Sequence, residues 1–352
     1  MHTLILPCAG RSTRFPISRP KWSLTHPYGE IMLIQSIKGL DLSKYNKIVA
    51  IFIKEDLENN LGLKEGIIKS FEALGLKYEL VILDSRTKSQ SETVYKGIKK
   101  LNIKGNILIK DCDSYFTCDY ESNNFVYVSS LQNLGKINAK SKSYVDIDTN
   151  NFIKTIVEKN VIGNLFCCGG YNFSNTEEFL KTYEYLSQFN NNEEIYISHI
   201  IYQQILDGKQ FNVKQTNNFK DWGTLEDWNE YKKQYKTLFL DIDGVLVENS
   251  GEYIGKIWGE TQGIHPNVQY INNLYETGKV RIILTTSRKS SYKKETLNQL
   301  ERENIKYHDI IFDLLHCQRV LVNDFSQTNS YPTSIGINLP RNDNNLKEYL
   351  KE

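Results

Sequence analysis

The chain has 352 residues, which is enough for two domains of ordinary size. Its net charge is +1, and this balance argues against a broad nucleic-acid-binding surface. No stretch is long and apolar enough to cross a membrane, and the sequence begins directly in a predicted strand without a basic leader. We therefore expect a cytoplasmic protein with neither a membrane nor a nucleic acid as partner, and the sequence leaves a homo-oligomer open.

The first 230 residues alternate short apolar runs with stretches of helical period. Strands are predicted at 3–7, 47–53, 78–83, 106–110, 125–130, 153–158, 166–173 and 211–215. Helices are predicted at 64–75, 91–101, 175–187 and 193–207. This alternation favours an α/β sheet that is largely parallel, in which ligands bind at the carboxyl ends of the strands.

A polar stretch at 229–236 predicts a boundary, after which the α/β pattern begins again. The second set of predicted elements comprises strand 237–241, helix 267–277, strand 280–285, helix 291–304, strand 319–323 and a final helix near 344–351. We therefore assign two domains, 1–230 and 236–352.

Six cysteines are present, without a Cys-x-x-Cys pair or a histidine at ligand spacing. Most lie in apolar or strand-like segments, so we expect small buried side chains in a reducing compartment rather than a zinc site or disulfides. They are Cys8, Cys112, Cys118, Cys167, Cys168 and Cys317.

The first predicted strand opens into a loop with residue types that bind phosphate. Gly10 permits close backbone approach, and the small Ser12 and Thr13 keep amide donors accessible. Three basic side chains supply positive charge, namely Arg11, Arg14 and Lys21. By itself such a loop is equally typical of a solvated basic turn.

Further motifs follow in a fixed order. They lie at 89–93 (Ser-Gln-Ser-Glu-Thr), 107–113 (a strand ending Lys-Asp-Cys-Asp), 157–159 (Val-Glu-Lys), 168–173 (Cys-Gly-Gly-Tyr-Asn-Phe) and 221–224 (Asp-Trp-Gly-Thr). Together with the loop and Pro20-Lys21, this series over residues 1–230 resembles the sugar-phosphate nucleotidyltransferases, also called nucleoside-diphosphate-sugar pyrophosphorylases. The loop departs from the family pattern at Ser12, where a second glycine is usual.

The resemblance implies a Rossmann-like, GT-A-like mixed sheet and a set of site residues. Nucleotide contacts are expected from Pro7, Ala9, Gly10, Arg11, Ser12, Thr13, Gln90, Glu92 and Thr93. Contacts with the sugar phosphate are expected from Glu158, Lys159, Gly169 and Gly170. Asp113 and Asp221 would hold Mg²⁺, Arg14 would stabilise the departing pyrophosphate, and Lys21 would contact the attacking phosphate or the α-phosphate.

Transfer of a nucleotidyl group to a sugar phosphate requires no covalent intermediate on the protein, so positioning and charge neutralisation dominate. Mg²⁺ prefers hard oxygen ligands such as the carboxylates of Asp113 and Asp221. Three alternatives stay open at this point. Asp111 is a second candidate ligand beside the favoured Asp113. Gln90 and Glu92 could simply begin a helix. Glu158 and Lys159 could form a solvated turn.

The second predicted domain opens with two carboxylates after a strand, Asp241 and Asp243, followed by Gly244. This segment, with 282–288 (Ile-Ile-Leu-Thr-Thr-Ser-Arg) and 321–324 (Leu-Val-Asn-Asp), resembles the haloacid-dehalogenase-like phosphatases. The resemblance implies that Asp241 attacks phosphorus and that Asp243 protonates the leaving group.

It further implies that Thr286 binds the phosphate and that Asp324 completes a Mg²⁺ site with Asp241 and Asp243. The third-motif lysine of that family has no clear counterpart, and His316 and Arg319 are approximate substitutes. About forty residues separate the first two motifs, which leaves room for a minimal cap only.

We therefore expect a bifunctional enzyme that joins a nucleoside triphosphate, with CTP favoured over UTP and dTTP, to a phosphorylated sugar or polyol. A CDP-polyol such as CDP-glucitol is the specific hypothesis. A phosphatase domain would act in the same bacterial capsule or surface-polysaccharide pathway. The alternatives are a glycosyltransferase that uses Asp111 and Asp113, and a C-terminal domain that serves only for oligomerisation.

Overall fold

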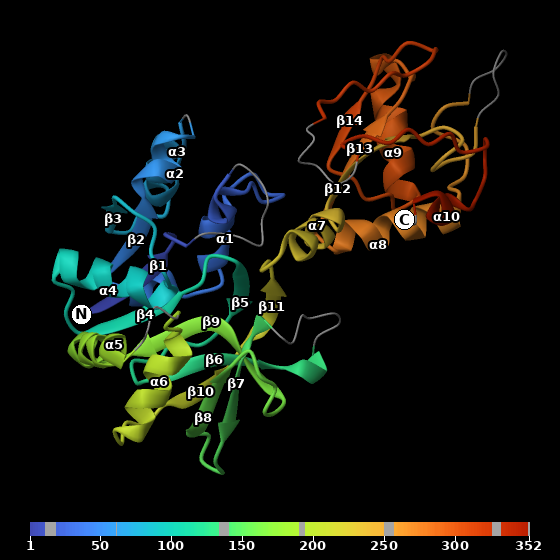
Figure 1. Cartoon of the computed structure of the whole chain (residues 1–352). Coiled ribbons are helices and arrows are strands. Elements are labelled where there is room, and N and C mark those ends of the chain that lie inside the picture. The colour runs from blue at the N-terminus through green and yellow to red at the C-terminus, as the bar shows by residue number, and fades with distance from the viewer. Residues whose placement is uncertain are drawn as a thin grey trace. The chain divides into compact units, whose positions relative to one another are not determined.

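The computed structural model describes residues 1–10, 19–60, 62–133, 141–189, 194–249, 257–325 and 332–350. The chain divides into two compact units, Met1–Trp228 and Asn229–Glu352, here called the N-terminal and the C-terminal unit. The division falls inside helix α7 (Leu225–Lys233), so most of the stretch 229–236, which was predicted as a polar boundary, is helical (Figure 1).

The N-terminal unit is built on a mixed sheet of nine described strands, in the order β10-β6-β9-β4-β1-β2-β3 with β7 and β8 attached beside β9. Its strands are β1 (His2–Pro7), β2 (Lys47–Ile53), β3 (Tyr78–Leu83), β4 (Asn106–Lys110), β6 (Phe125–Ser130), β7 (Ser143–Ile147), β8 (Ile153–Glu158), β9 (Leu165–Phe173) and β10 (Asn212–Gln215). A separate antiparallel pair consists of β5 (Ser114–Thr117) and β11 (Asn217–Asp221).

The predicted mixed sheet is confirmed, but the expectation of a largely parallel sheet is wrong. Strands β1 to β4 are parallel neighbours, whereas β9 runs antiparallel to both β4 and β6. Strands β7 and β8 add a further antiparallel hairpin. The apolar runs predicted the strands correctly, but they carry no information about strand direction.

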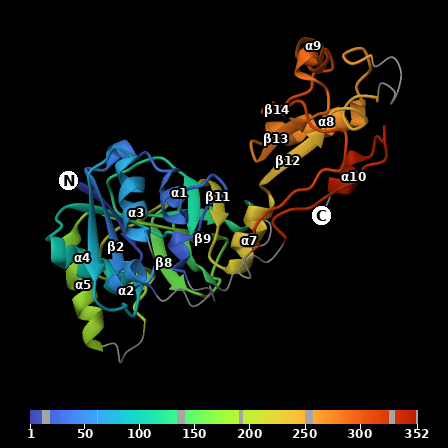
Figure 2. The same ribbon diagram turned by 90° about the horizontal axis from the view of Figure 1, so that it is seen from above.

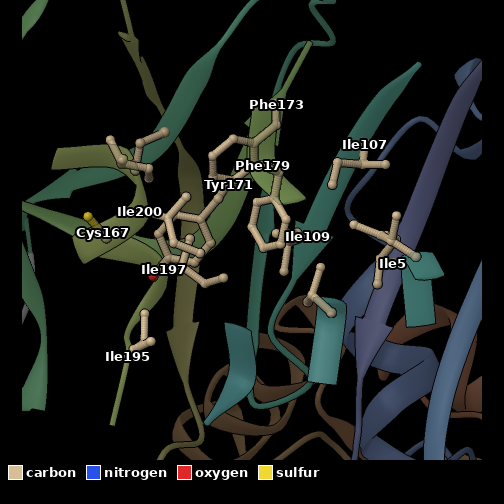
Figure 3. Close-up of a cluster of buried hydrophobic side chains, with 14 of the residues drawn as sticks. Ile5, Ile107, Ile109, Cys167, Tyr171, Phe173, Phe179, Ile195, Ile197 and Ile200 are labelled. Atoms are coloured by element: carbon tan, nitrogen blue, oxygen red, sulfur yellow. The ribbon is translucent and has the colours of Figure 1, made fainter. Parts of the chain in front are cut away.

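Helices cover both faces of this sheet because successive side chains of a strand point to opposite sides. Ile5 packs in one core with α4, α5 and α6, and Leu4 and Leu6 pack in the other with α1 and α3. Figure 3 shows the first core, where Phe179 of α5 lies against Phe173 of β9. The helices are α1 (Met32–Ile37), α2 (Lys54–Glu58), α3 (Leu63–Glu72), α4 (Gln90–Leu101), α5 (Thr176–Phe189) and α6 (Ile197–Leu206), with 3-10 turns η1 (Lys21–Ser23), η2 (Leu42–Lys44) and η3 (Leu131–Asn133).

The C-terminal unit contains a parallel sheet of three described strands, which lie side by side in Figure 2. The strands are β12 (Lys236–Asp241), β13 (Val280–Thr285) and β14 (Asp309–Ile311). The helices are α8 (His265–Glu276), α9 (Lys293–Arg302) and α10 (Leu346–Leu350), with a 3-10 turn η5 (Ser290–Tyr292). Its core gathers apolar side chains from β12, β13, α8 and α9.

Two expectations for this unit and for the cysteines are wrong. Residues 319–323 form no strand, and Val320, Leu321 and Val322 are 76%, 59% and 88% exposed. Cys317 is exposed, although Cys8, Cys167 and Cys168 are buried as expected. An apolar run forms a strand only if a neighbouring strand pairs with it, and the described sheet offers no such partner here.

None of the helices in the described ranges combines the length and apolar character needed to cross a bilayer.

Candidate functional site

Ala9 and Gly10, which follow β1, are anchored by a neighbouring segment that the sequence did not single out. Arg86 donates to the carbonyl of Gly10 at 3.2 Å and pairs with Asp56 at 2.5 Å. The Thr87 hydroxyl donates to the carbonyl of Ala9 at 3.4 Å. The start of the loop is thereby held beside the N-terminus of α4. The described residues do not include four of the expected phosphate-binding residues, Arg11, Ser12, Thr13 and Arg14.

A buried lysine organises the turn that follows β4. The Lys110 ammonium donates to the carbonyls of Asp111 and Ser114 at 2.7 and 2.8 Å and to the Ser114 hydroxyl at 2.9 Å. It also lies 4.7 Å from the centre of the Phe116 ring. Burial lowers the pKa of Lys110 to about 8. These three hydrogen bonds fix the path of the chain around Asp111 and Asp113, the two candidate metal ligands in this turn.

Asp111 faces the interior of the site. Its carboxylate accepts from Gln90, and its backbone N–H donates to the Gly169 carbonyl at 2.8 Å. Burial raises the pKa of the Asp111 carboxyl. Gly169 has a φ of +83°, and a Cβ there would lie 2.5 Å from Asp111 Oδ2, while a Cβ at Gly170 would lie 2.6 Å from the Tyr127 ring. Both glycines therefore make room for neighbouring side chains.

Strand pairing brings Asp113 and Asp221 together, although they are far apart in the sequence. Asp113 directly precedes β5, and Asp221 ends β11, where it is the register partner of Ser114. The Trp222 N–H donates to the Asp113 carbonyl at 2.8 Å, which extends the pairing by one bond. The backbone positions of the two acids are therefore neighbours at one end of the two-stranded sheet.

Each of these acids forms an ion pair with a lysine from another element. Lys21 of η1 pairs with Asp113, and Lys142 pairs with Asp221 at 2.7 Å. The four side chains are between 11% and 17% exposed, so both pairs are largely shielded from water. Lys21 was an expected site residue; Lys142 was not, because nothing in its sequence context links it to residue 221.

The two carboxylates at this end are of a chemical type that binds magnesium. Mg²⁺ is commonly held by one or two carboxylates together with substrate phosphates. Asp113 and Asp221 carry hard oxygen atoms at neighbouring backbone positions and each is paired with a lysine, whereas Asp111 accepts from Gln90. No group of three or more His, Cys, Asp or Glu side chains in the described part of the chain forms a complete ligand set.

The segment expected to contact the nucleobase is largely occupied by capping helix α4. Ser89 is the N-cap and accepts from the Glu92 N–H at 3.1 Å, while the Glu92 carboxylate accepts from the Lys88 N–H at 2.6 Å. Ser89 thus caps the helix, and Glu92 satisfies the N–H of the residue that precedes the cap. Thr93 is buried and bonded to the Ser89 carbonyl at 3.2 Å. Gln90 alone of the three expected contacts is directed toward the acidic turn.

The hairpin of β7 and β8 carries the expected acceptor residues. Glu158 accepts from Ser198 at 2.8 Å, so its carboxylate is anchored to α6. Lys159 is exposed and has a φ of +56°. The Lys159 ammonium lies 4.3 Å from the centre of the Tyr196 ring. The backbone N–H of Lys159 donates to the backbone carbonyl of Lys142 at 3.0 Å. Glu158 therefore has a structural partner, and Lys159 stands at the surface beside Lys142.

In the C-terminal unit, Asp241 ends β12 opposite Thr285 of β13. Arg319 donates to Asp241 Oδ1 at 3.2 Å and to the Thr285 hydroxyl at 3.3 Å. Burial raises the pKa of Asp241, and the Arg319 charge lowers it in part. The positively charged Arg319 therefore lies beside Asp241, the expected nucleophile. Arg319 is one of the two residues, with His316, that were considered as substitutes for the missing lysine.

Asp243 is held by Arg288, to which the sequence motifs give no role. The Arg288 guanidinium is 0% exposed and donates to both Asp243 carboxylate oxygens, at 2.7 and 2.9 Å. Its remaining nitrogen donates to the Thr296 hydroxyl at 3.1 Å. Thr286 is also fully buried, and its hydroxyl accepts from the Arg288 N–H at 3.1 Å.

Asp324 is exposed and lies beyond the segment that was wrongly predicted as a strand. Its N–H bonds locally to Asn323, and its carbonyl accepts from Thr333. Among the residues described, the structure gathers no three-acid ligand set from Asp241, Asp243 and Asp324. The expected carboxylate cluster needs residue 324 at the end of a paired strand, and that strand is not formed.

Comparison with known proteins identifies the fold. No family model matches this sequence. No curated protein is detectably similar to it either. Among solved structures, the nucleoside-diphosphate-sugar pyrophosphorylase from Vibrio cholerae RC9 matches with a TM-score of 0.55 at 20% identity, over 65% of this chain and 98% of that one.

Two further matches agree. The inositol-1-phosphate CTP transferase from T. maritima has a TM-score of 0.51 at 16% identity, over 64% of this chain and 90% of that one. A UDP-glucose pyrophosphorylase complexed with UDP-glucose has a TM-score of 0.52 at 17% identity, over 66% of this chain and 99% of that one. The chain therefore contains a mixed α/β fold like that of these nucleotidyltransferases.

Proposed function

We propose that this protein is a nucleotidyltransferase that joins a nucleoside triphosphate to a phosphorylated sugar or polyol and releases pyrophosphate. The observation that carries the proposal is the meeting of Asp113 and Asp221 at one end of the β5–β11 pair, with a lysine on each. The solved structures with this fold include pyrophosphorylases and a CTP transferase. Their fold and this acidic pair support the same class of reaction.

In the proposed mechanism the protein positions two anionic substrates and balances their charge. The loop after β1, anchored through Gly10 and Arg86, would receive the triphosphate, with Arg14 at the departing pyrophosphate. Lys21 would contact the α-phosphate, and Lys159 the acceptor. Asp113 and Asp221 would hold Mg²⁺, which when bound neutralises charge at the α-phosphate.

CTP is the proposed nucleotide and a polyol phosphate the proposed acceptor, with a CDP-polyol such as CDP-glucitol as product. The solved structures with this fold include a CTP transferase and UDP-glucose pyrophosphorylases alike, so the choice of CTP rests on the loop motif after β1 and Pro20-Lys21. A matrix of four triphosphates against phosphorylated sugars and polyols, read by pyrophosphate release, tests both. Highest turnover with CTP is expected, and a preference for UTP or dTTP would replace this specificity while leaving the reaction class intact.

A glycosyltransferase is the alternative reaction, since Asp111 and Asp113 are two residues apart. The structure disfavours this use, because Asp111 is turned toward Gln90 and packed against Gly169. Release of a nucleoside diphosphate from a nucleotide-sugar, without pyrophosphate release from any triphosphate, would establish it.

For the C-terminal unit we propose a phosphatase activity in the same pathway, without assigning it a metal, because the expected ligands Asp241, Asp243 and Asp324 are not gathered among the described residues. The contact of Arg319 with Asp241 and Thr285 favours it, because a phosphoryl group on Asp241 needs a neighbouring positive charge. Asp241→Asn should abolish phosphate release from small phosphomonoesters and leave pyrophosphate release intact. If wild-type protein releases no phosphate across a panel of such esters, the unit is a non-catalytic module.

A further inference from the structure

Two cysteines follow the ends of neighbouring strands in the N-terminal site. Strands β1 and β4 are parallel, with Ile5 opposite Ile109. Continued beyond these residues, the same register sets Cys8 opposite Cys112. Paired strands lie about 4.8 Å apart, and a disulfide spans Cα atoms that are about 4.4–6.8 Å apart. The register therefore gives these two positions the backbone spacing of a disulfide.

The side chains of the two cysteines lie on the same side of the sheet. Every second residue of a strand faces the same way. Cys8 accordingly belongs to the core that contains Leu6, and Cys112 packs against that core, as does Leu108. Burial raises the pKa of the Cys8 thiol, and a hydrogen bond with the Cys112 side chain raises it further. The two thiols are therefore neighbours.

Cys168 is the competing neighbour of Cys112. The register of β4 with β9 sets Lys110 opposite Gly170, and its continuation brings Cys168 beside Cys112 on the other flank. The Cys168 sulfur, however, is engaged with the Thr216 hydroxyl at 3.3 Å. The contact between the thiols of Cys8 and Cys112 therefore favours Cys8 as the partner.

The two thiols differ in their access to solvent. Cys8 is 2% exposed, whereas Cys112 is half-buried. A small reagent can therefore reach Cys112, while Cys8 is shielded and meets the Cys112 sulfur instead. An accessible thiol beside a second, resolving thiol is the arrangement found in redox-sensing proteins.

We propose that Cys8 and Cys112 form a redox modification site, where exchange with a small disulfide joins the two residues and switches the N-terminal site off. The Cys112 thiolate attacks one sulfur of the small disulfide, whose S–S bond breaks to release one thiol. The Cys8 thiol then attacks the Cys112 sulfur of the mixed disulfide, and the second small thiol leaves. Two electrons and two protons thus pass to the small disulfide. Disulfides in reducing compartments are usually transient in this way.

The new bond would act on the acidic turn, because Cys112 lies between Asp111 and Asp113. A disulfide holds its sulfur atoms about 2 Å apart, closer than two hydrogen-bonded thiols, so the turn must shift relative to Cys8. Asp113 is a proposed metal ligand, and a misplacement of about 1 Å costs roughly 100-fold in rate. The loss of activity rests on the function proposed above, whereas formation of the bond does not.

Peptide mapping tests the bond without any turnover. The full-length Cys317→Ser chain, which lacks the exposed thiol, is treated with oxidised glutathione and digested without reductant. Tandem mass spectrometry should find a pair of peptides joined through Cys8 and Cys112, which dithiothreitol separates. Unmodified thiols, glutathione on Cys112 alone, or a bond from Cys112 to Cys168 would overturn the inference.

Cys118 offers a matched control, because it is half-buried and packs against the same core as Cys112. Introduced into the Cys317→Ser chain, Cys118→Ser should keep the cross-link. Cys8→Ser and Cys112→Ser should each abolish it. A cross-link that survives in either of these two variants, or that disappears in Cys118→Ser, would assign the bond to other thiols.

Activity measurements test the switch. Oxidised glutathione should lower pyrophosphate release by the Cys317→Ser chain roughly 10- to 100-fold, and dithiothreitol should restore it. The same treatment should leave the rates of Cys8→Ser and Cys112→Ser within about twofold of their untreated values, because neither forms the bond. Full activity in cross-linked protein, or equal inhibition of all variants, would overturn the switch. Absence of pyrophosphate release by reduced protein would instead remove the proposed function, and the peptide map would still decide whether the bond forms.

Discussion

The two units surround their acidic pairs with different cations, and the difference suggests different uses. In the N-terminal unit Asp113 and Asp221 are paired with Lys21 and Lys142. In the C-terminal unit Asp243 is held at two points by the fully buried Arg288. A lysine is a single charge on a flexible stem, whereas an arginine presents a rigid fork of donors. The first arrangement can admit a ligand by moving a side chain, and the second fixes the acid in place.

The largest expected effect concerns the fixed pair. Arg288→Met leaves the Asp243 carboxylate without its two-point partner and should destabilise the C-terminal unit by about 3–5 kcal/mol. Chemical denaturation followed by circular dichroism measures the change. Lys306→Met is the control, because Lys306 and Glu276 form an exposed pair, and it should cost less than about 1 kcal/mol. Similar losses in the two variants would show that Arg288 does not anchor the unit.

The second prediction breaks the acidic pair of the N-terminal unit. Asp221→Asn should reduce kcat/KM for pyrophosphate release roughly 100-fold, as when one preorganised charged or polar group is removed. This corresponds to a loss of about 3 kcal/mol of transition-state stabilisation. Asp146→Asn, in an exposed ion pair on β7, should leave activity unchanged. Full activity in Asp221→Asn would exclude this acid from the reaction.

The third prediction uses two buried histidines of the N-terminal unit. Burial lowers the pKa of His2 and of His26 to about 4 from an ordinary 6.5. Between these values the unfolded chain binds more protons than the folded one, so stability must fall on acidification through that window. Each histidine should cost up to about 2 kcal/mol between pH 6.5 and 5.

Trp258→Phe leaves a full-length chain whose three remaining tryptophans lie in the N-terminal unit. Thermal unfolding of the Trp258→Phe chain, followed by tryptophan fluorescence, measures this slope for the N-terminal unit. His26→Phe keeps an aromatic ring among Trp222 and Trp228 and removes one titrating group. The variant should lose about half of the pH dependence of the free energy of unfolding. An unchanged slope would mean that the His26 ring is not held in its neutral form.

The smallest effect tests the packing of the acidic turn. Gly169→Ala combines a positive φ with a Cβ placed 2.5 Å from Asp111, whereas Gly208 has nearly the same φ, +84°, and open space around it. Gly169→Ala should therefore destabilise by about 1–2 kcal/mol more than Gly208→Ala, the cost of overpacking alone. Equal losses in denaturant unfolding would show that the Asp111 carboxylate does not pack there.

The sequence predicted those parts of the fold that carry long apolar runs. All eight predicted strands of the N-terminal unit are present, and all except the short β10 bury side chains on a sheet covered by helices. Strands β5, β7 and β11 were missed because they are four or five residues long and mix polar with apolar residues. Residues 319–323 were wrongly predicted as a strand because they include an apolar run, although these apolar side chains are exposed in the structure.

The site was predictable only as far as its motifs extend. Asp113 and Asp221 were found from their motifs, and their pairing follows from β5 and β11, which the sequence pattern did not predict. Lys142 and Arg86 could not be found because their contacts depend on which distant segments adjoin in the fold. Arg288 stood inside a recognised motif, and its burial against Asp243 is what the sequence could not provide.

The central claim is that Asp113 and Asp221 hold one divalent cation between them. Titration of the full chain with Mn²⁺, followed by electron paramagnetic resonance, tests it in wild-type protein, Asp113→Asn, Asp221→Asn and the double variant. If both acids share one ion, each single variant loses the same site and the double variant loses nothing more. Additive losses in the double variant, or undiminished Mn²⁺ binding in either single variant, would contradict the account.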